Sequence, residues 1–208
     1  MDATQKETDI ESHTVMLYGQ QTINDAFINA IMTYGFNQYD ESKTDSIMHV
    51  SADYDMDSVF SQVMAGYNFG LGKFIITPKT GLRYLWTHMR DYTDSVGQYV
   101  QSKNTNTFTG VVGTTLSSDF NVQGFTFVPK LTLAGTYDLK KDGGRSTVTL
   151  ANGANYTTRG DTLKRFGIET GVGLNMSYEN FEFGIQYEGR FKKDYKDHTG
   201  LINFRYNF

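Results

Sequence analysis

The clearest pattern in the chain is a strict alternation of apolar and polar residues at its C-terminal end. Four apolar residues share one parity: Ile202, Phe204, Tyr206 and Phe208. Polar residues hold the opposite parity: Asn203, Arg205 and Asn207. A period of two places the two sets on opposite faces of a β-strand. The last eight residues are therefore predicted to be a strand with one apolar and one polar face.

The same period recurs along the chain, although less cleanly toward the N-terminus. The nine predicted strands cover residues 15–23, 26–36, 59–69, 74–86, 106–116, 125–137, 163–178, 181–191 and 201–208. Most contain about 10–14 residues, whereas strands of soluble proteins most often contain five or six. Membrane β-strands need about 9–11 residues. The strand lengths therefore favour a protein that crosses a membrane.

The connections between these strands alternate between short and long. The short ones are 24–25, 70–73, 118–123 and 179–180, and the long polar ones are 38–57, 90–104, 139–162 and 192–198. Short turns on one side and long loops on the other are typical of an outer-membrane barrel. If Phe208 ends a strand at the periplasmic side, all four long loops are extracellular. We expect a polar N-terminal segment at residues 1–11 and one outer-membrane β-barrel domain at residues 12–208.

Alternation alone does not show which face points inward, so a soluble up-and-down barrel with an apolar interior is the competing interpretation. The polar face carries ionisable residues of both signs, which can pair with each other or be hydrated in a barrel lumen. We predict that nine of them line the lumen: Lys79, Arg83, Lys130, Arg165, Glu169, Glu182, Glu188, Arg190 and Arg205. The same face is rich in glycine, which suits a crowded interior.

Aromatic residues favour the membrane interpretation. They lie on the apolar face near the strand ends, as do Phe74 and Trp86, or Phe125 and Tyr137. Aromatic girdles at both lipid–water interfaces are expected of membrane barrels. The prediction is an all-β, antiparallel, up-and-down transmembrane β-barrel in the bacterial outer membrane.

Composition is consistent with this picture and excludes other classes. The chain has 208 residues, 21 Gly, 2 Pro and no Cys, with a net charge of −4. The absence of Cys excludes a disulfide scaffold, and the mixed charge gives no indication of a nucleic-acid partner. No apolar run reaches the ~18 residues of a membrane helix. The first residues lack the basic and apolar regions of a signal peptide, so the protein is either not exported or part of a longer chain.

Candidate catalytic and metal-binding chemistry is sparse. The four His residues do not have ligand spacing, and the alternating Asp53, Asp55 and Asp57 lack the Gly and Glu of a calcium loop. No Ser has a nucleophile motif. We therefore expect no enzymatic activity and no cofactor. The acids Glu169, Glu182 and Glu188 are interpreted as structural charges that pair with lumen arginines such as Arg165, Arg190 and Arg205.

Three stretches carry a resemblance to a known family. They are residues 64–69 with 76–84, residues 167–174 and residues 203–208. Together they resemble the C-terminal translocator domain of a bacterial autotransporter, over nearly the whole chain from about residue 12. The abundance of Asn, Lys, Tyr and Ile hints at an AT-rich genome and a rickettsial surface antigen.

The resemblance also concerns the C-terminal aromatic residues. Phe204, Tyr206 and Phe208 are similar to the signal that the outer-membrane barrel assembly machinery reads. That signal commonly has Gly five residues before the final Phe, where this chain has Asn203.

The resemblance implies a twelve-stranded barrel that anchors in outer-membrane lipid and serves as the exit pore for an upstream passenger domain. A helix that crosses the lumen would join the two. The chain shows only nine strands, so we expect a copy truncated at its N-terminus, and a tenth strand between Ile47 and Tyr54 is a further possibility. The alternative function is a non-secreting outer-membrane barrel, such as a small porin or an adhesin that acts through its extracellular loops.

Overall fold

The structure is a computed structural model of the chain, and it describes residues 5–44, 48–160, 164–193 and 195–207. All regular elements within these ranges are β-strands, and paired strands run antiparallel. The part of the chain that the structure describes contains no helix long and apolar enough to cross a membrane.

Nine long strands follow each other in chain order across one sheet. They are β1 (Gln5–Ile23), β2 (Ala26–Thr44), β3 (His49–Tyr67), β5 (Phe74–Met89), β8 (Thr105–Ser118), β10 (Phe125–Lys141), β13 (Phe166–Tyr178), β14 (Phe181–Lys192) and β15 (Tyr195–Tyr206). Two short strands, β4 (Phe69–Leu71) and β9 (Phe120–Val122), extend the turns by pairing with β5 and β10. This confirms the all-β class, the antiparallel up-and-down order and the nine predicted strands.

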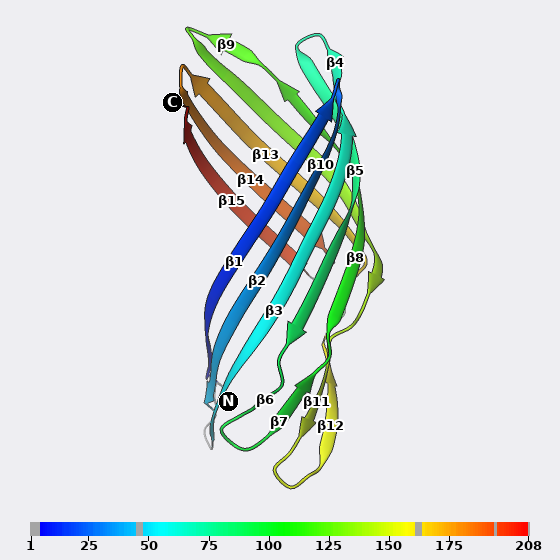
Figure 1. Cartoon of the computed structure of the whole chain (residues 1–208), viewed down its shortest axis with the longest axis vertical. Coiled ribbons are helices and arrows are strands. Elements are labelled where there is room, and N and C mark those ends of the chain that lie inside the picture. Colours follow the sequence, from blue (N-terminus) through cyan, green and yellow to red (C-terminus); the bar gives the residue numbers. More distant parts are fainter. Residues whose placement is uncertain (1–4, 45–47, 161–163, 194, 208) are drawn as a thin grey trace.

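The sheet curls into a half-barrel with strongly tilted strands (Figure 1). Its two edges are β1 and β15, and among the described residues no further strand pairs with either edge. Close approaches at glycine allow the curl. A Cβ on Gly81 would lie 2.2 Å from the carbonyl oxygen of Val63, and one on Gly113 would lie 2.5 Å from the Cβ of Ala134. The concave inner face is therefore packed tightly at this bend.

The turns and the loops lie at opposite ends of the half-barrel. The four short turns and the C-terminal end of β15 are at the upper end of Figure 1. At the lower end, β6 (Tyr92–Thr93), β7 (Tyr99–Ser102), β11 (Arg145–Thr149) and β12 (Asn155–Arg159) form a second sheet in the order β12-β11-β7-β6. The segregation of short and long connections predicted from the sequence is therefore present.

The prediction that the long connections are open polar loops was wrong. Residues 38–44 and 49–57 continue β2 and β3, and the second sheet comes from residues 92–102 and 145–159 within two of the predicted loops. The turn between β14 and β15 is also tighter than the predicted loop at 192–198. The reason is that antiparallel pairing does not end at the membrane: polar residues extend the ladder into solvent.

The extension of β1, β2 and β3 also changes two smaller predictions. The proposed tenth strand near Ile47 to Tyr54 is the start of β3 from His49 onward, and residues 45–47 lie outside the described residues. The ring of Tyr39 stacks on that of Tyr54 at 5.0 Å, and Tyr54 stacks on Tyr92 at 4.8 Å. Of the polar segment predicted at residues 1–11, residues 5–11 pair with residues 38–44 as the first part of β1.

Candidate functional site on the inner face

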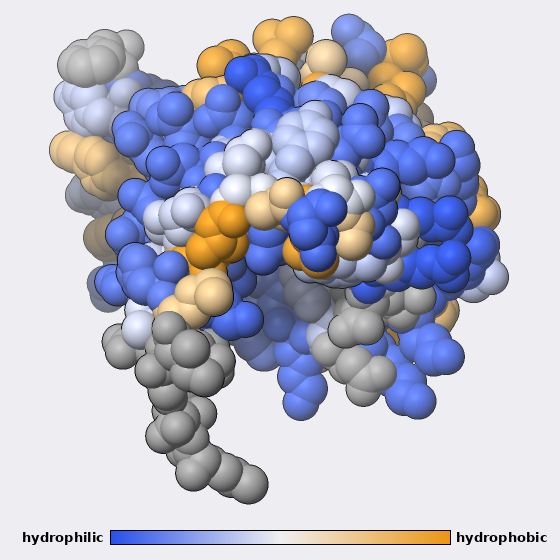
Figure 2. Space-filling model, turned by 90° about the horizontal axis from the view of Figure 1, so that it is seen from below, coloured by the Kyte–Doolittle hydropathy of each residue, from blue (hydrophilic) through white to orange (hydrophobic). Residues whose placement is uncertain are grey.

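The two faces of the curled sheet differ sharply in chemistry. Apolar side chains such as Val15, Leu131 and Val172 are exposed on the convex outer face, with exposed fractions of 72%, 53% and 57%. The concave inner face holds an open cavity of about 630 Å³ that is lined largely by polar and small residues. Viewed from the end that carries the second sheet, the surface is mostly hydrophilic, with much of the hydrophobic surface toward the margin (Figure 2). An apolar exterior around a polar interior is the reverse of a soluble barrel.

Aromatic residues bracket the apolar outer face. Phe125 and Tyr137 lie on one strand, twelve residues apart, and Phe166 and Tyr178 have the same separation on the neighbouring strand. At ~3.3 Å per residue and a tilt of ~45°, twelve residues rise about 28 Å. That height matches the apolar band of a membrane barrel. The rings also touch across strands, with the Phe125 and Tyr178 centroids 4.4 Å apart.

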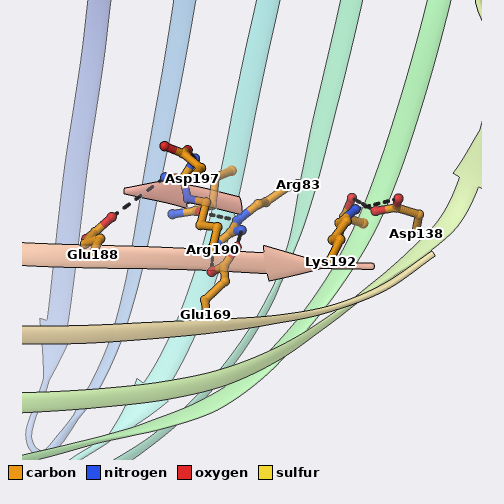
Figure 3. A network of polar contacts seen from close by, with 9 residues as sticks. Arg83, Asp138, Glu169, Glu188, Arg190, Lys192 and Asp197 are labelled. Carbon is orange, nitrogen blue, oxygen red and sulfur yellow. Dashed lines mark hydrogen bonds and ion pairs between the residues drawn. The ribbon is translucent and has the colours of Figure 1, made fainter. Parts of the chain in front are cut away.

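One ion pair spans the concave face. Arg83 on β5 donates two hydrogen bonds to Glu169 on β13, with N–O distances of 2.5 and 2.8 Å, although β8 and β10 lie between the two strands (Figure 3). The Nε of Arg83 also donates to Oε1 of Gln62 at 2.6 Å. Both charged side chains are only about one-fifth exposed, at 22% and 19%. Charge-assisted bidentate pairs are strong and directional, so this contact links β5 to β13 across the curled sheet.

Other predicted lumen charges pair with near neighbours. Arg190 lies 3.7 Å from Glu188 and 3.8 Å from Asp197, and Arg205 lies 3.5 Å from Glu182. The expected pairing of lumen acids with arginines is thus seen for Glu182 and Glu188. For Glu169 the partner is Arg83 rather than Arg165.

Arg165 lies at the outer rim instead. Its Nη1 donates to the backbone oxygens of Asp138 and Leu139 at 3.3 and 3.2 Å. These carbonyls belong to a bulge, because the β8–β10 register shifts between Asp138 and Lys140. Arg165 therefore satisfies backbone groups that the bulge removes from the ladder.

The most buried charge on the inner face was missed by sequence reasoning. Asp138 is 1% exposed, accepts a hydrogen bond from Lys192 Nζ at 2.7 Å and another from Thr109 at 2.9 Å. Lys141 Nζ lies 3.8 Å from the same carboxylate. The signal was present, since Asp138 and Lys192 continue the polar parities of the predicted strands at 125–137 and 181–191. The predicted strands end at residues 137 and 191, one residue short of Asp138 and Lys192, and Lys192 was placed in the predicted loop 192–198.

Two predicted lumen lysines differ from the rest. Lys79 and Lys130 line the cavity, and within the described ranges neither has a hydrogen bond or a carboxylate within ion-pair distance, although Glu188 and Glu169 attract Lys79 from further away. Lys79 lies opposite Gly66 and Gly113 on its two neighbouring strands, so its side chain has space on both sides. The inner face therefore offers two unpaired cations beside the Arg83–Glu169 pair.

The terminal aromatic residues lie at the opposite end of the molecule from the second sheet. Phe204 and Tyr206 are 67% and 41% exposed on the outer face, and both rings approach Phe181, with centroid distances of 6.0 and 4.9 Å. Phe208 lies outside the described residues. Among the side chains that the structure describes, no group of three or more His, Cys, Asp or Glu residues could hold a metal ion.

Comparison with known families is consistent with this arrangement. The sequence model of the family described as "Autotransporter beta-domain" matches residues 1–188. The chain belongs to this family. As an autotransporter β-domain it is a translocator domain of the bacterial outer membrane, as the resemblance of its motifs implied.

A curated relative and two solved structures agree. Outer membrane protein A of Rickettsia conorii is 27% identical over 217 residues, covering 96% of this chain and 11% of that protein. The β-domain of the Bordetella autotransporter BrkA has a TM-score of 0.71 at 14% identity, covering 100% of this chain and 76% of that one. The translocator domain of NalP from Neisseria meningitidis has the same TM-score and identity, with coverages of 97% and 69%.

The family model therefore identifies the chain as an autotransporter β-domain, and the solved structures share its fold. The chain spans about a tenth of the length of the rickettsial protein that it matches. Its similarity to the solved domains, at 14% identity, concerns the barrel fold.

Proposed function

We propose that the inner face of this autotransporter β-domain lines the exit path for a passenger segment joined to its N-terminal side. The observation that carries the proposal is the reversal of polarity: a polar cavity of about 630 Å³ lies inside a surface that is apolar outside. A polypeptide that crosses a bilayer carries backbone groups that cannot be left unsatisfied in lipid. A hydrated inner face removes that cost.

The small residues of the inner face support the same role. Gly171 and Gly173 lie on β13 among the cavity-lining residues, and a Cβ at either position would make only ordinary contacts of 3.4 Å or more. Side chains could therefore be accommodated there, yet the positions are left open. The unpaired Lys79 and Lys130 can bind carboxylate or carbonyl oxygens of a segment that occupies the space. This role needs neither a catalytic group nor a cofactor.

The apolar outer face and its girdles supply the anchor, and the C-terminal aromatic residues supply a contact for assembly. We infer that Phe204 and Tyr206, with Phe208, are read by the outer-membrane barrel assembly machinery. Support comes from the position of Phe204 and Tyr206 on the exposed outer face of an edge strand, where another protein can reach them.

The export role is tested by filling the cavity. In a precursor with a protease-sensitive passenger N-terminal to this chain, Gly173→Trp places an indole in the path. We expect most of the passenger to be lost from the cell surface, measured by protease digestion of intact cells. The matched control is Gly135→Trp on the outer face, where a Cβ would meet atoms only at 3.9 Å or beyond. The control should display its passenger normally.

Heat-modifiable mobility of both variants on gels shows whether the barrel still folds. Equal surface display by two folded variants would contradict the export path. The assembly contact is tested separately with Phe204→Ser/Tyr206→Ser against Ile185→Ser/Ile202→Ser, which removes outer apolar surface away from the terminal aromatic residues. We expect only the first pair to lower the folded fraction in the outer membrane strongly, and equal losses would contradict a specific signal.

A further inference from the structure

The girdle that contains Tyr137 and Phe166 lies toward the end of the molecule that carries the second sheet. Beyond this girdle, the outward-facing charges differ between the two halves of the sheet. On β1, β2 and β3 they are mainly acidic: Asp9, Glu11, Asp40, Asp53 and Asp55, of which Asp55 is paired with Arg90 at 3.2 Å. Asp9, Asp40 and Asp53 even lie directly opposite one another across the three strands. On β10 and β15 the outward residues at this level are Lys140, Lys196 and His198. We call these three residues the basic band.

Lys140 faces outward because of the bulge in β10. Inner and outer positions alternate regularly up to Asp138, and an unbroken strand would point residue 140 into the lumen. The register shift after Asp138 instead places Lys140 opposite Phe108, whose strand neighbour on the other side is the outward Tyr84. Bulges commonly re-aim a side chain at functional positions. The Lys140 side chain is 68% exposed, and its Nζ lies 3.9 Å from the carboxylate of Asp142, close to the outer limit of an ion pair.

Lys196 and His198 lie against the girdle on the edge strand. Lys196 is opposite Phe191 in the β14–β15 ladder and is exposed, with no hydrogen bond or ion pair to any described residue. The His198 ring lies 5.7 Å from that of Phe191 and 6.0 Å from that of Tyr187. Tyr187 and His198 also share a hydrogen bond at 2.6 Å. The ammonium group of Lys196, opposite the interfacial ring of Phe191, is thereby placed at the depth of lipid headgroups.

We propose that the basic band binds the phosphate groups of outer-leaflet lipid headgroups. Lys140 and Lys196 are three strand positions apart, about 15 Å along the perimeter at ~4.8 Å per strand, so they serve neighbouring lipids. The girdle rings below them contact the acyl chains. The acidic residues on β1, β2 and β3 repel the same phosphates. Anionic lipid therefore collects beside β10 to β15. Lipid binding by the basic band requires that the chain lies in the outer membrane. It does not require that the inner face exports a passenger.

The test uses the full chain, purified in a neutral detergent, with native mass spectrometry as the readout. Phosphatidylglycerol and phosphatidylcholine with identical acyl chains are the probes. We expect the protein to retain phosphatidylglycerol preferentially. Lys140→Gln/Lys196→Gln should lower that preference roughly 25-fold, since a surface lysine contributes about 1 kcal/mol, or about fivefold, to anionic-lipid binding. Both residues are exposed, so the substitutions leave the folded sheet intact.

The matched control is Lys43→Gln/Lys103→Gln, which removes the same charge from exposed positions outside the basic band. The control should keep the wild-type preference. Equal losses in the two double variants would show a net-charge effect and overturn the proposal. Inorganic phosphate in excess should not displace phosphatidylglycerol. Displacement by free phosphate would indicate a simple anion site and would also overturn it.

Discussion

Leu131 and Thr132 are adjacent residues of β10 that lie in different solvents. Leu131 lies halfway between the girdle residues Phe125 and Tyr137 and is 53% exposed on the outer face. Thr132 lines the inner cavity and shares a hydrogen bond with Thr115 at 2.9 Å. The contrast shows that one alternating sequence specifies two environments, and that exposure of an apolar residue here indicates contact with lipid.

The largest expected effect comes from placing a charge on each side of this boundary. Leu131→Arg puts a guanidinium at the middle of the bilayer, which should destabilise the folded barrel by about 2–4 kcal/mol. Thr132→Arg puts the same group in the hydrated cavity, with a loss of about 1 kcal/mol for the broken hydrogen bond. Urea unfolding in lipid vesicles measures both. Equal destabilisation would show that the two faces do not differ as described.

A second contrast lies within the inner face, between its deep and its peripheral ion pairs. Arg83→Ala leaves Glu169 with little solvent and removes the contact across β8 and β10, so we expect a loss of about 2–3 kcal/mol. Arg205→Ala breaks a pair whose side chains are 68% and 45% exposed. That loss should stay below about 1 kcal/mol. Unfolding of the single variants and of Arg83→Ala/Glu169→Ala gives the coupling energy, and a coupling near zero would refute the structural role of the deep pair.

The smallest effect concerns the hairpin that extends beyond the membrane. Burial, and secondarily Glu41, raises the pKa of Tyr54 from 10.0 to about 12. A raised pKa means that the neutral phenol favours the folded hairpin, so this stabilisation is full below pH 10 and is lost as the pH rises toward 12. Amide hydrogen exchange of residues 49–56 should therefore accelerate in that range, beyond the intrinsic base catalysis.

Tyr54→Phe cannot ionise and serves as the control for the hairpin. It should show no such added acceleration between pH 10 and 12, whereas residues within the membrane-spanning part of β3 should be unaffected in both proteins. The same pH profile in Tyr54→Phe and wild type would mean that the tyrosine stack does not hold the hairpin.

The fold could be predicted from the sequence because lipid imposes a strict period. A spanning strand presents mostly apolar or small residues at each second position, and the sequence contains nine such segments. Beyond the girdles this constraint ends. In the extension of β2 and β3 the outward positions are polar, as at Asp40 and Asp53, and apolar residues such as Val50 and Met56 take the inward parity. The outward apolar stripe by which the spanning strands were recognised therefore stops there.

The pairings on the inner face were only partly predictable. Glu182 and Arg205 lie on adjacent strands, so parity and register suffice to bring them together. Arg83 and Glu169 are separated by two intervening strands and meet only because the sheet curls, which depends on close packing at Gly81 and Gly113. The direction of Lys140 was also hidden, because a single bulge reverses the parity that predicts it.

The central claim, that the inner face is hydrated and the outer face lies in lipid, can be tested directly because the chain contains no cysteine. Single cysteines at Thr132 and Asn175 on the inner face, and at Leu131 and Val172 on the outer face, can be treated in outer membranes with a charged maleimide. The account predicts rapid labelling at the two inner positions and almost none at the two outer ones until detergent is added. Labelling of the outer positions in intact membranes, with protection of the inner ones, would contradict it.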